Sequence, residues 1–344
     1  MKALYAHGAR DLRLADCEAG PPGPGEVLLR VRRGGICGSD LHYYNHGGFG
    51  AVTLREPMIL GHEIAAEVAE LGAGVSGLAA GDLVAVSPSR PCGACRHCLK
   101  GLPNQCENMR FYGSAMPFPH IQGAFRQEIV ALASQCVPAG GLDAARAAMA
   151  EPLSVALHAV RRAGDLLGRR VLVTGCGPIG VLAILAARAA GAGEITAVDV
   201  ADRALGFAEQ AGAARLLNTA ADRDALAEDS RGKGSFDVLF ECSGAAAALA
   251  AGIGALAPRG VIVQLGMSGE MTLPILPVIA KELEIRGSFR FHEEFAVAVA
   301  MMRDGRIDPG FLLTDTMPLA EFGAAFETAS DKSRAMKVQL DFAG

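Results

Sequence analysis

The sequence predicts an α/β protein made of two parts, an N-terminal part built from short strands and a doubly wound parallel sheet after it. Residues 1 to about 150 are rich in Gly and Pro with short apolar runs between them, which is typical of an all-β barrel or sandwich. Residues 169–288 alternate strand-like and Ala-rich helical segments, which is typical of a parallel sheet. A length of 344 residues fits about two domains.

The N-terminal part contains three clear strand patterns, at residues 27–31, 64–68 and 83–86. The last of them follows the turn signal Gly81-Asp82. Near residue 141 the composition becomes Ala-rich, and we predict helices at 143–149 and 153–163, with Pro152 at the break between them.

The second part predicts six strands and three helices in alternation. The predicted strands are 171–174, 195–198, 215–218, 237–240, 261–265 and 283–288. The predicted helices are 179–190, 202–211 and 245–256.

The composition excludes several partners. The formal net charge is −5 and no basic tract occurs, which argues against nucleic acid. Residues 1–16 lack the apolar stretch of a signal peptide, and the most apolar run, 179–187, is shorter than the roughly 20 residues that span a bilayer. We therefore expect a soluble, cytoplasmic protein that acts on a small molecule, without membrane partners.

The first strand of the second part leads directly into a Gly-x-Gly-x-x-Gly motif. Gly175 permits a tight turn, Gly177 lets a pyrophosphate approach the backbone, and Gly180 lets the following helix pack on the strand. The next strand ends in Asp199, where an acidic residue is expected to hold the adenosine ribose. This context predicts a dinucleotide site rather than a glycine-rich turn of another α/β protein.

Four of the nine cysteines form a compact cluster. Its spacing is C-x-x-C-x-x-C-x7-C, formed by Cys92, Cys95, Cys98 and Cys106. Four thiolates suit a closed tetrahedral zinc site, which has no position for substrate. The alternatives, a disulfide pair or incidental cysteines, fit the spacing and the expected compartment poorly.

A second metal site is indicated by Cys37, in a Gly-rich segment, and His62, in Gly61-His62-Glu63. One thiolate and one imidazole are half of a catalytic zinc site, which keeps one position open. The third ligand must come from elsewhere, and both Glu63 and Glu151 are candidates. Taken alone, these residues are also compatible with ordinary structural roles.

These motifs resemble those of the zinc-dependent medium-chain dehydrogenases over essentially the whole chain. The supporting segments are 35–40 (GICGSD), 61–63 (GHE), the four-cysteine cluster, 123–125 (GAF), 151–153 (EPL) and the nucleotide motif. Segments 41–44, 109–116, 134–138 and 287–291 look most like the branch that acts on polyols and sugar acids. The resemblance implies a GroES-like catalytic domain at 1–153, completed by the tail 290–344, and a Rossmann domain at 154–289.

The resemblance also implies roles for individual residues. Zinc is held by Cys37 and His62, with Glu63 and Glu151 completing the site directly or through bound water. The alcohol dehydrogenases have a cysteine where this chain has Glu151, which favours polyols. Ser39 takes the proton of the substrate hydroxyl and His42 passes it on. The remaining implied site residues are Tyr43 and Arg290 on the substrate side, and Pro178, Ile179, Arg203, Leu265 and Phe289 at the cofactor.

The implied reaction is hydride transfer between a secondary hydroxyl and NAD(P), with one catalytic and one structural zinc. L-idonate, oxidised to 5-keto-D-gluconate, is the first substrate implied, and sorbitol and xylitol come next. Asp199 should favour NAD, although Arg203 leaves NADP possible. The family suggests a homodimer or homotetramer. The alternatives are a non-catalytic NAD-binding regulator and a zinc-free quinone reductase, which would lack the cysteine cluster.

Overall fold

The computed structural model describes residues 1–267 and 269–343. The chain forms two compact units, unit 1 (Met1–Glu151 with Phe295–Gly344) and unit 2 (Pro152–Glu294). Among the described residues, no helix combines the length and the apolar character needed to cross a membrane.

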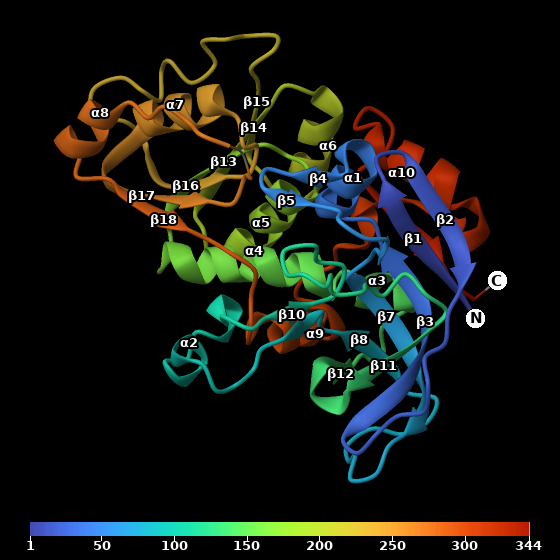
Figure 1. The fold of residues 1–344 in the computed structure, drawn as a ribbon. Coiled ribbons are helices and arrows are strands. Elements are labelled where there is room, and N and C mark those ends of the chain that lie inside the picture. The colour runs from blue at the N-terminus through green and yellow to red at the C-terminus, as the bar shows by residue number, and fades with distance from the viewer. Residues whose placement is uncertain (268, 344) are drawn as a thin grey trace. The chain divides into compact units, whose positions relative to one another are not determined.

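Unit 2 is built on a six-stranded parallel sheet (Figure 1). Its strands are β13 (Arg170–Thr174), β14 (Glu194–Asp199), β15 (Arg215–Asn218), β16 (Phe236–Glu241), β17 (Leu256–Gln264) and β18 (Glu284–Gly287). They lie in the order β15-β14-β13-β16-β17-β18. The direction of winding reverses between β13 and β16, and such a switch point is where open parallel sheets bind ligands.

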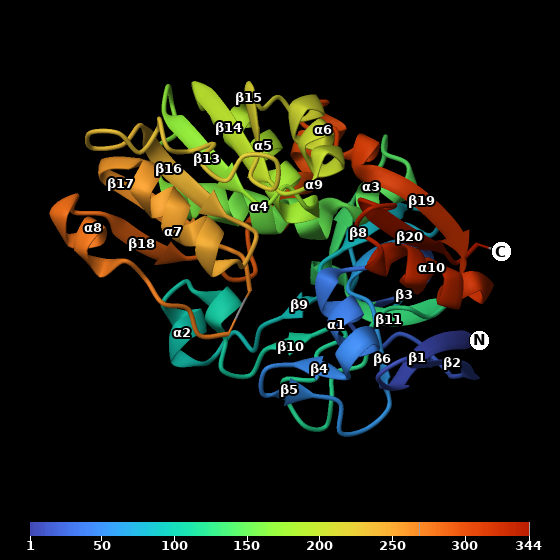
Figure 2. The same cartoon turned by 90° about the horizontal axis from the view of Figure 1, so that it is seen from above.

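Helices cover both faces of this sheet. The helices of unit 2 are α4 (Ala150–Ala163, which begins in unit 1), α5 (Pro178–Ala189), α6 (Asp202–Gln210), α7 (Ala246–Ala255) and α8 (Ile275–Ala280). Because parallel crossovers are right-handed, α5 and α7 lie on opposite faces, as Figures 1 and 2 show. Buried residues such as Leu172, Phe236 and Leu239 fill the space between sheet and helices.

Unit 1 is built on a seven-stranded, mainly antiparallel sheet. Its strands are β3 (Glu26–Gly35), β7 (Glu63–Leu71), β8 (Leu83–Val86), β11 (Glu128–Leu132), β12 (Cys136–Pro138), β19 (Leu313–Pro318) and β20 (Lys337–Asp341). The tail strand β20 pairs antiparallel with β3, with Gln339 opposite Gly35. The last residues of the chain therefore complete the sheet begun near its start.

Smaller elements surround this sheet. The remaining strands are β1 (Lys2–Gly8), β2 (Asp11–Asp16), β4 (Gly48–Phe49), β5 (Val52–Thr53), β6 (Met58–Ile59), β9 (Ser89–Arg90) and β10 (Arg110–Phe111). The helices are α1 (Gly38–His46), α2 (Arg96–Leu99), α3 (Ala144–Ala148), α9 (Glu294–Arg303) and α10 (Phe322–Ser330), with short 3₁₀ turns at Pro103–Gln105, Ala133–Gln135, Gly310–Leu312 and Leu319–Glu321. The core joins Phe125 to the tail residues Phe326 and Phe342.

The predicted fold class is confirmed, with three local corrections. Pro152 does not break the chain between two helices but lies in the first turn of α4, where a missing N–H costs no hydrogen bond. Strand β17 starts at Leu256, although its regular pairing begins at Val261 because of an irregularity in between. Helix α1 was not predicted, since Gly38 at its start obscures the helical pattern.

Candidate active site

Three potential metal ligands of unit 1 meet at the ends of two paired strands. One ligand atom each of Cys37, His62 and Glu63 lies within 4.8 Å of the other two. Cys37 follows β3 and caps α1, while Glu63 opens β7 and pairs with Gly35 of β3. A side chain at Gly35 would meet the Glu63 carboxylate at 2.1 Å, so only glycine leaves room for that carboxylate.

Asp40 organises the loops that carry Cys37 and His62. Its carboxylate is fully buried and accepts the backbone N–H of Cys37 and of Gly61, each at 3.0 Å. It also lies 3.8 Å from His62 Nδ1. The prediction missed Asp40, although its position at the third residue of α1 is a recognisable helix-capping signal.

Lys337 of β20 is the cation of this cluster. Its ammonium group is 4% exposed and donates hydrogen bonds to Glu63 Oε1 at 2.7 Å and to the Ile36 carbonyl at 3.1 Å. Burial lowers the pKa of Lys337, but the charges of Glu63 and Cys37 outweigh it and raise the pKa overall. Lys337 therefore stays charged and balances the Glu63 carboxylate. Nothing in its local sequence signalled this role.

Glu151, in the first turn of α4, is buried beside this cluster but is not one of the three converging ligands. Burial is the main cause that raises its pKa to about 8, and the charges of Glu63 and Cys37 act in the same direction. His62 and Lys337 oppose the shift. Without an additional cation, Glu151 is therefore a mostly protonated carboxyl group at neutral pH.

The three converging residues fit a zinc ion with an open position. A thiolate, an imidazole and a carboxylate are the donor types of catalytic zinc, and a fourth position stays available for substrate. Burial, reinforced by Glu63, raises the pKa of the Cys37 thiol to about 12. A buried thiolate at this position therefore requires a nearby cation, and Lys337 is already paired with Glu63.

The four-cysteine cluster is also assembled. One sulfur each of Cys92, Cys95, Cys98 and Cys106 lies within 4.8 Å of the others. The Cys106–Cys92 and Cys95–Cys106 sulfur distances are 3.4 and 4.0 Å, close to the ~3.8 Å edge of a tetrahedron with zinc–sulfur bonds of about 2.3 Å. Backbone N–H groups of Ala94 and Cys95 lower the pKa of Cys92 to about 6, which favours a thiolate. The cluster fits a closed structural zinc site.

Helix α1 carries three further predicted residues, and they differ in environment. Ser39 and His42 are three residues apart and so lie on the same side of the helix. Burial is the main cause that lowers the pKa of His42, with His46 and Lys332 contributing. Tyr43 is only 2% exposed, and its hydroxyl accepts the Ala115 N–H at 3.0 Å. This placement supports packing rather than contact with substrate.

The glycine motif of unit 2 shows the geometry that each glycine was expected to allow. Gly175 has a φ of +84°, and a Cβ there would lie 2.6 Å from the Ser243 nitrogen. A Cβ on Gly180, in the first turn of α5, would lie 1.8 Å from the Gly175 carbonyl. A Cβ on Gly177 would meet nothing within 4 Å, so the backbone there is open to a ligand.

Asp199 lies at the end of β14, beside this motif. Its carboxylate accepts the N–H groups of Cys176 at 2.6 Å, Val200 at 2.7 Å and Ala201 at 3.0 Å. These hydrogen bonds fix the carboxylate next to the glycine turn. Arg203 is exposed at the start of α6, with its guanidinium 5.6 Å from the Phe207 ring centroid.

The other predicted cofactor and substrate residues of unit 2 follow its strands β13, β17 and β18. Pro178 and Ile179 open α5, and Leu265 follows β17, where its N–H donates to the Glu241 carbonyl at 2.9 Å. Phe289 is 44% exposed, and the guanidinium of Arg290 lies 4.8 Å from its ring centroid. Arg290 has a left-handed φ of +57°, so its backbone does not continue the extended conformation of the preceding strand.

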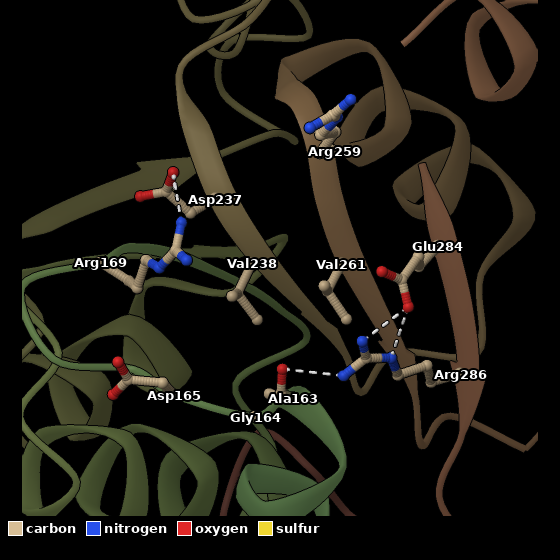
Figure 3. Close-up of a pocket in the computed structure, with 10 residues that line it drawn as sticks. All are labelled: Ala163, Gly164, Asp165, Arg169, Asp237, Val238, Arg259, Val261, Glu284 and Arg286. Atoms are coloured by element: carbon tan, nitrogen blue, oxygen red, sulfur yellow. Dashed lines mark hydrogen bonds and ion pairs between the residues drawn. The ribbon is translucent and has the colours of Figure 1, made fainter. Parts of the chain in front are cut away.

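Unit 2 also has a cavity of about 260 Å³ at the end of the sheet opposite to the glycine motif (Figure 3). Its walls include Arg169, Asp237, Glu284 and Arg286, near the amino ends of the strands. Arg286 contacts Glu284 at 2.6 Å and Arg169 contacts Asp237 at 3.5 Å. Because its charges compensate one another and it lies away from the glycine motif, the cavity is not part of the predicted site.

Two protein-family models match the chain. A model described as alcohol dehydrogenase GroES-like domain matches residues 23–141. A model described as zinc-binding dehydrogenase matches residues 178–304.

Curated proteins and solved structures match nearly the full length. L-idonate 5-dehydrogenase (NAD(P)(+)) of Escherichia coli K12 is 44% identical over 92% of this chain and 92% of its own length. Sorbitol dehydrogenase of Bos taurus is 35% identical over 98% of this chain and 95% of its own length. The crystal structure of the Escherichia coli L-idonate 5-dehydrogenase superimposes with a TM-score of 0.94 at 40% identity, covering 99% of this chain and 97% of the other. The chain therefore belongs to the zinc-binding, NAD(P)-dependent dehydrogenases with a GroES-like domain, in the group that includes polyol and sugar-acid dehydrogenases.

Proposed function

We propose that this protein oxidises a secondary hydroxyl of a sugar acid or polyol with NAD, and that L-idonate, converted to 5-keto-D-gluconate, is its preferred substrate. The observation that carries the proposal is the convergence of Cys37 with the buried His62 and Glu63, whose donor types fit zinc with an open position. The similarity to L-idonate 5-dehydrogenase supports the choice of substrate.

The residues of unit 1 would divide the work as follows. Cys37, His62 and Glu63 would hold the zinc, which when bound would supply a Lewis acid that lowers the pKa of a substrate hydroxyl, and the bound nicotinamide would supply the hydride acceptor. Asp40 fixes the loops that carry Cys37 and His62, because its carboxylate bonds both backbones. Glu151 adds a carboxyl group beside the ligands, as a ligand itself or through bound water.

The proton leaves along α1 in this proposal. Ser39 takes it from the substrate hydroxyl, and His42, three residues further along the same side of the helix, passes it to solvent. The lowered pKa of His42 supports this role, because a neutral imidazole can accept the proton. The burial of Tyr43 gives no support to its predicted contact with substrate.

Unit 2 would bind the dinucleotide at its switch point. Gly175, Gly177 and Gly180 shape the turn, and Pro178 and Ile179 open the helix whose N-terminus faces the pyrophosphate. Asp199 accepts the ribose hydroxyls and favours NAD over NADP. Leu265 and Phe289 would line the cofactor, and Arg290 would bind a substrate carboxylate or hydroxyl.

We propose that the four-cysteine cluster holds the structural zinc and that the protein is a cytoplasmic homodimer or homotetramer. None of the nine cysteines forms a disulfide, which supports a reducing compartment. Strand β18 is an edge strand, and Ile275, Leu276 and Ile285, on α8 and β18, are exposed apolar residues. An edge of this kind supports association with a second copy. Light scattering of the purified protein tests it, and a monomer would contradict it.

A substrate panel with metal analysis tests the proposed activity. The zinc-loaded protein is given NAD or NADP with L-idonate, sorbitol, xylitol and L-threonine, and 5-keto-D-gluconate with NADH for the reverse reaction. We expect about two zinc ions per chain and the highest kcat/KM with L-idonate and NAD. A higher kcat/KM with sorbitol or xylitol would make the protein a polyol dehydrogenase. No turnover of any compound with both zinc ions bound would favour the non-catalytic regulator.

A further inference from the structure

Glu241 lies at the switch point of the unit 2 sheet. It is the last residue of β16, and it is paired with Thr174, the last residue of β13, and with Gln264, the last residue of β17. Its side chain is 0% exposed. A carboxylate is therefore buried directly below the crevice where parallel sheets of this topology bind dinucleotides.

Both carboxylate oxygens of Glu241 accept hydrogen bonds from the loops around it. Oε1 accepts the Ser243 N–H at 2.9 Å, and Oε2 accepts the Gln264 side-chain amide at 2.5 Å. The Gly244 N–H lies 3.1 Å from both oxygens. The Ser243 hydroxyl also donates to Oε1, so N–H and O–H donors surround the carboxyl group. No salt bridge to Glu241 is formed by the residues that the structure describes, so no side-chain cation is paired with this carboxyl group.

Glu241 also fixes the three loops that follow β13, β16 and β17. A Cβ on Gly266, after β17, would lie 2.6 Å from Glu241 Oε2 and 2.2 Å from the Gly244 nitrogen. A Cβ on Gly175, after β13, would lie 2.6 Å from the Ser243 nitrogen. The loops after β13 and β17 thus pack against Glu241 and the residues that follow it, with no space for a side chain at Gly175 or Gly266.

We propose that Glu241 is a positioning residue of the dinucleotide site whose negative charge favours oxidised over reduced cofactor. The inference rests on the proposed NAD-dependent function. In a doubly wound sheet the half that contains β13 and β14 takes the adenosine, and the half that begins with β16 takes the nicotinamide. The nicotinamide ring is positively charged only in its oxidised form. A buried carboxylate acts through a low dielectric and therefore stabilises NAD⁺ selectively.

The ratio of two dissociation constants tests this effect. Calorimetry with the full zinc-loaded chain gives the Kd for NAD⁺ and for NADH. Glu241→Gln keeps the shape and removes the charge, so the ratio Kd(NAD⁺)/Kd(NADH) should rise at least about threefold. A loosened loop alone would weaken both forms equally and leave the ratio unchanged. Glu194→Gln, at the amino end of β14 and so at the opposite end of the sheet from Glu241, is the matched control and should keep the wild-type ratio.

A second variant covers the case in which Glu241→Gln does not fold. Gln264→Lys places an ammonium group where an amide now donates to Glu241, so it neutralises the charge without removing the acceptor. It should raise the ratio in the same direction. A wild-type ratio in either folded variant would overturn the inference. A wild-type protein that binds neither NAD⁺ nor NADH would instead overturn the proposed function.

Discussion

Replacing Lys337 with Met should destabilise the protein more without zinc at the Cys37 site than with it. In the metal-free cluster, Lys337 is the ion-pair partner of the buried Glu63 carboxylate, with which it makes a hydrogen bond of 2.7 Å. Removing one partner of a buried pair costs about 3–5 kcal/mol of unfolding free energy. With zinc bound, the metal charge balances Glu63, and the loss is mainly that of the unpaired Ile36 carbonyl, about 1–3 kcal/mol.

The difference between the two losses of unfolding free energy equals the change in the free energy of zinc binding. By linkage, a loss that is about 2 kcal/mol smaller in the loaded protein means zinc binding that is roughly thirtyfold tighter in Lys337→Met. Urea denaturation of both metal states, with zinc content measured in each sample, gives both losses. Lys281→Met is the control, because Lys281 donates only to backbone carbonyls of unit 2, such as Gly254 at 2.7 Å. This variant should lose the same amount of unfolding free energy with and without zinc. Equal losses in Lys337→Met would refute the role of Lys337 as counter-ion of Glu63.

Three further predictions concern the two metal sites, the cofactor and pH. Cys37→Ala should abolish turnover and keep the fold, whereas Cys95→Ala should lose the structural zinc and lower the Tm; zinc analysis, activity and thermal unfolding separate them. Asp199→Gly should erode the preference for NAD, with Arg203 then admitting NADP, which kcat/KM with each cofactor measures. Because the folded-state pKa of Glu151 is raised to about 8, its contribution to the stability of the zinc-free protein is complete below its unfolded pKa of about 4.3 and is lost as pH rises to about 8. Glu151→Gln should make the urea midpoint of the zinc-free protein depend less on pH. An unchanged pH dependence of the midpoint would contradict the raised pKa of Glu151.

The parts of the fold that could be predicted are those with a local signal. The alternation of strands and helices located the sheet of unit 2, and β15 was predicted with its observed bounds, 215–218. The four cysteines are close in sequence, so their convergence follows from spacing alone. The glycine motif was also predictable, because each glycine answers a local steric requirement.

The residues that escaped prediction depend on contacts between distant segments. Lys337 reaches Glu63 across 274 positions of sequence, because β20 pairs with β3. Glu241 is an acidic residue at the end of an apolar strand, and such a position gives no sign of burial in the sequence. Only the packing of the loops around it shows that it is fully buried. Tyr43 follows His42 on α1, but the helix turns it into the core. Sequence neighbours of a site residue therefore need not face the site.

The charges of the unit 1 cluster explain why it requires a divalent cation. Burial is the first cause that raises the pKa of Cys37, Asp40 and Glu151 alike. Because the pKa reaches about 12 for Cys37 and about 8 for Glu151, these two groups tend to keep their protons without a metal. The fourth acidic group, Glu63, is paired with Lys337. Among residues 1–267 and 269–343, no Lys or Arg side chain forms an ion pair with Cys37, Asp40 or Glu151. A zinc ion supplies two positive charges at the point where the ligands meet. Zinc uptake is then coupled to proton release from this cluster.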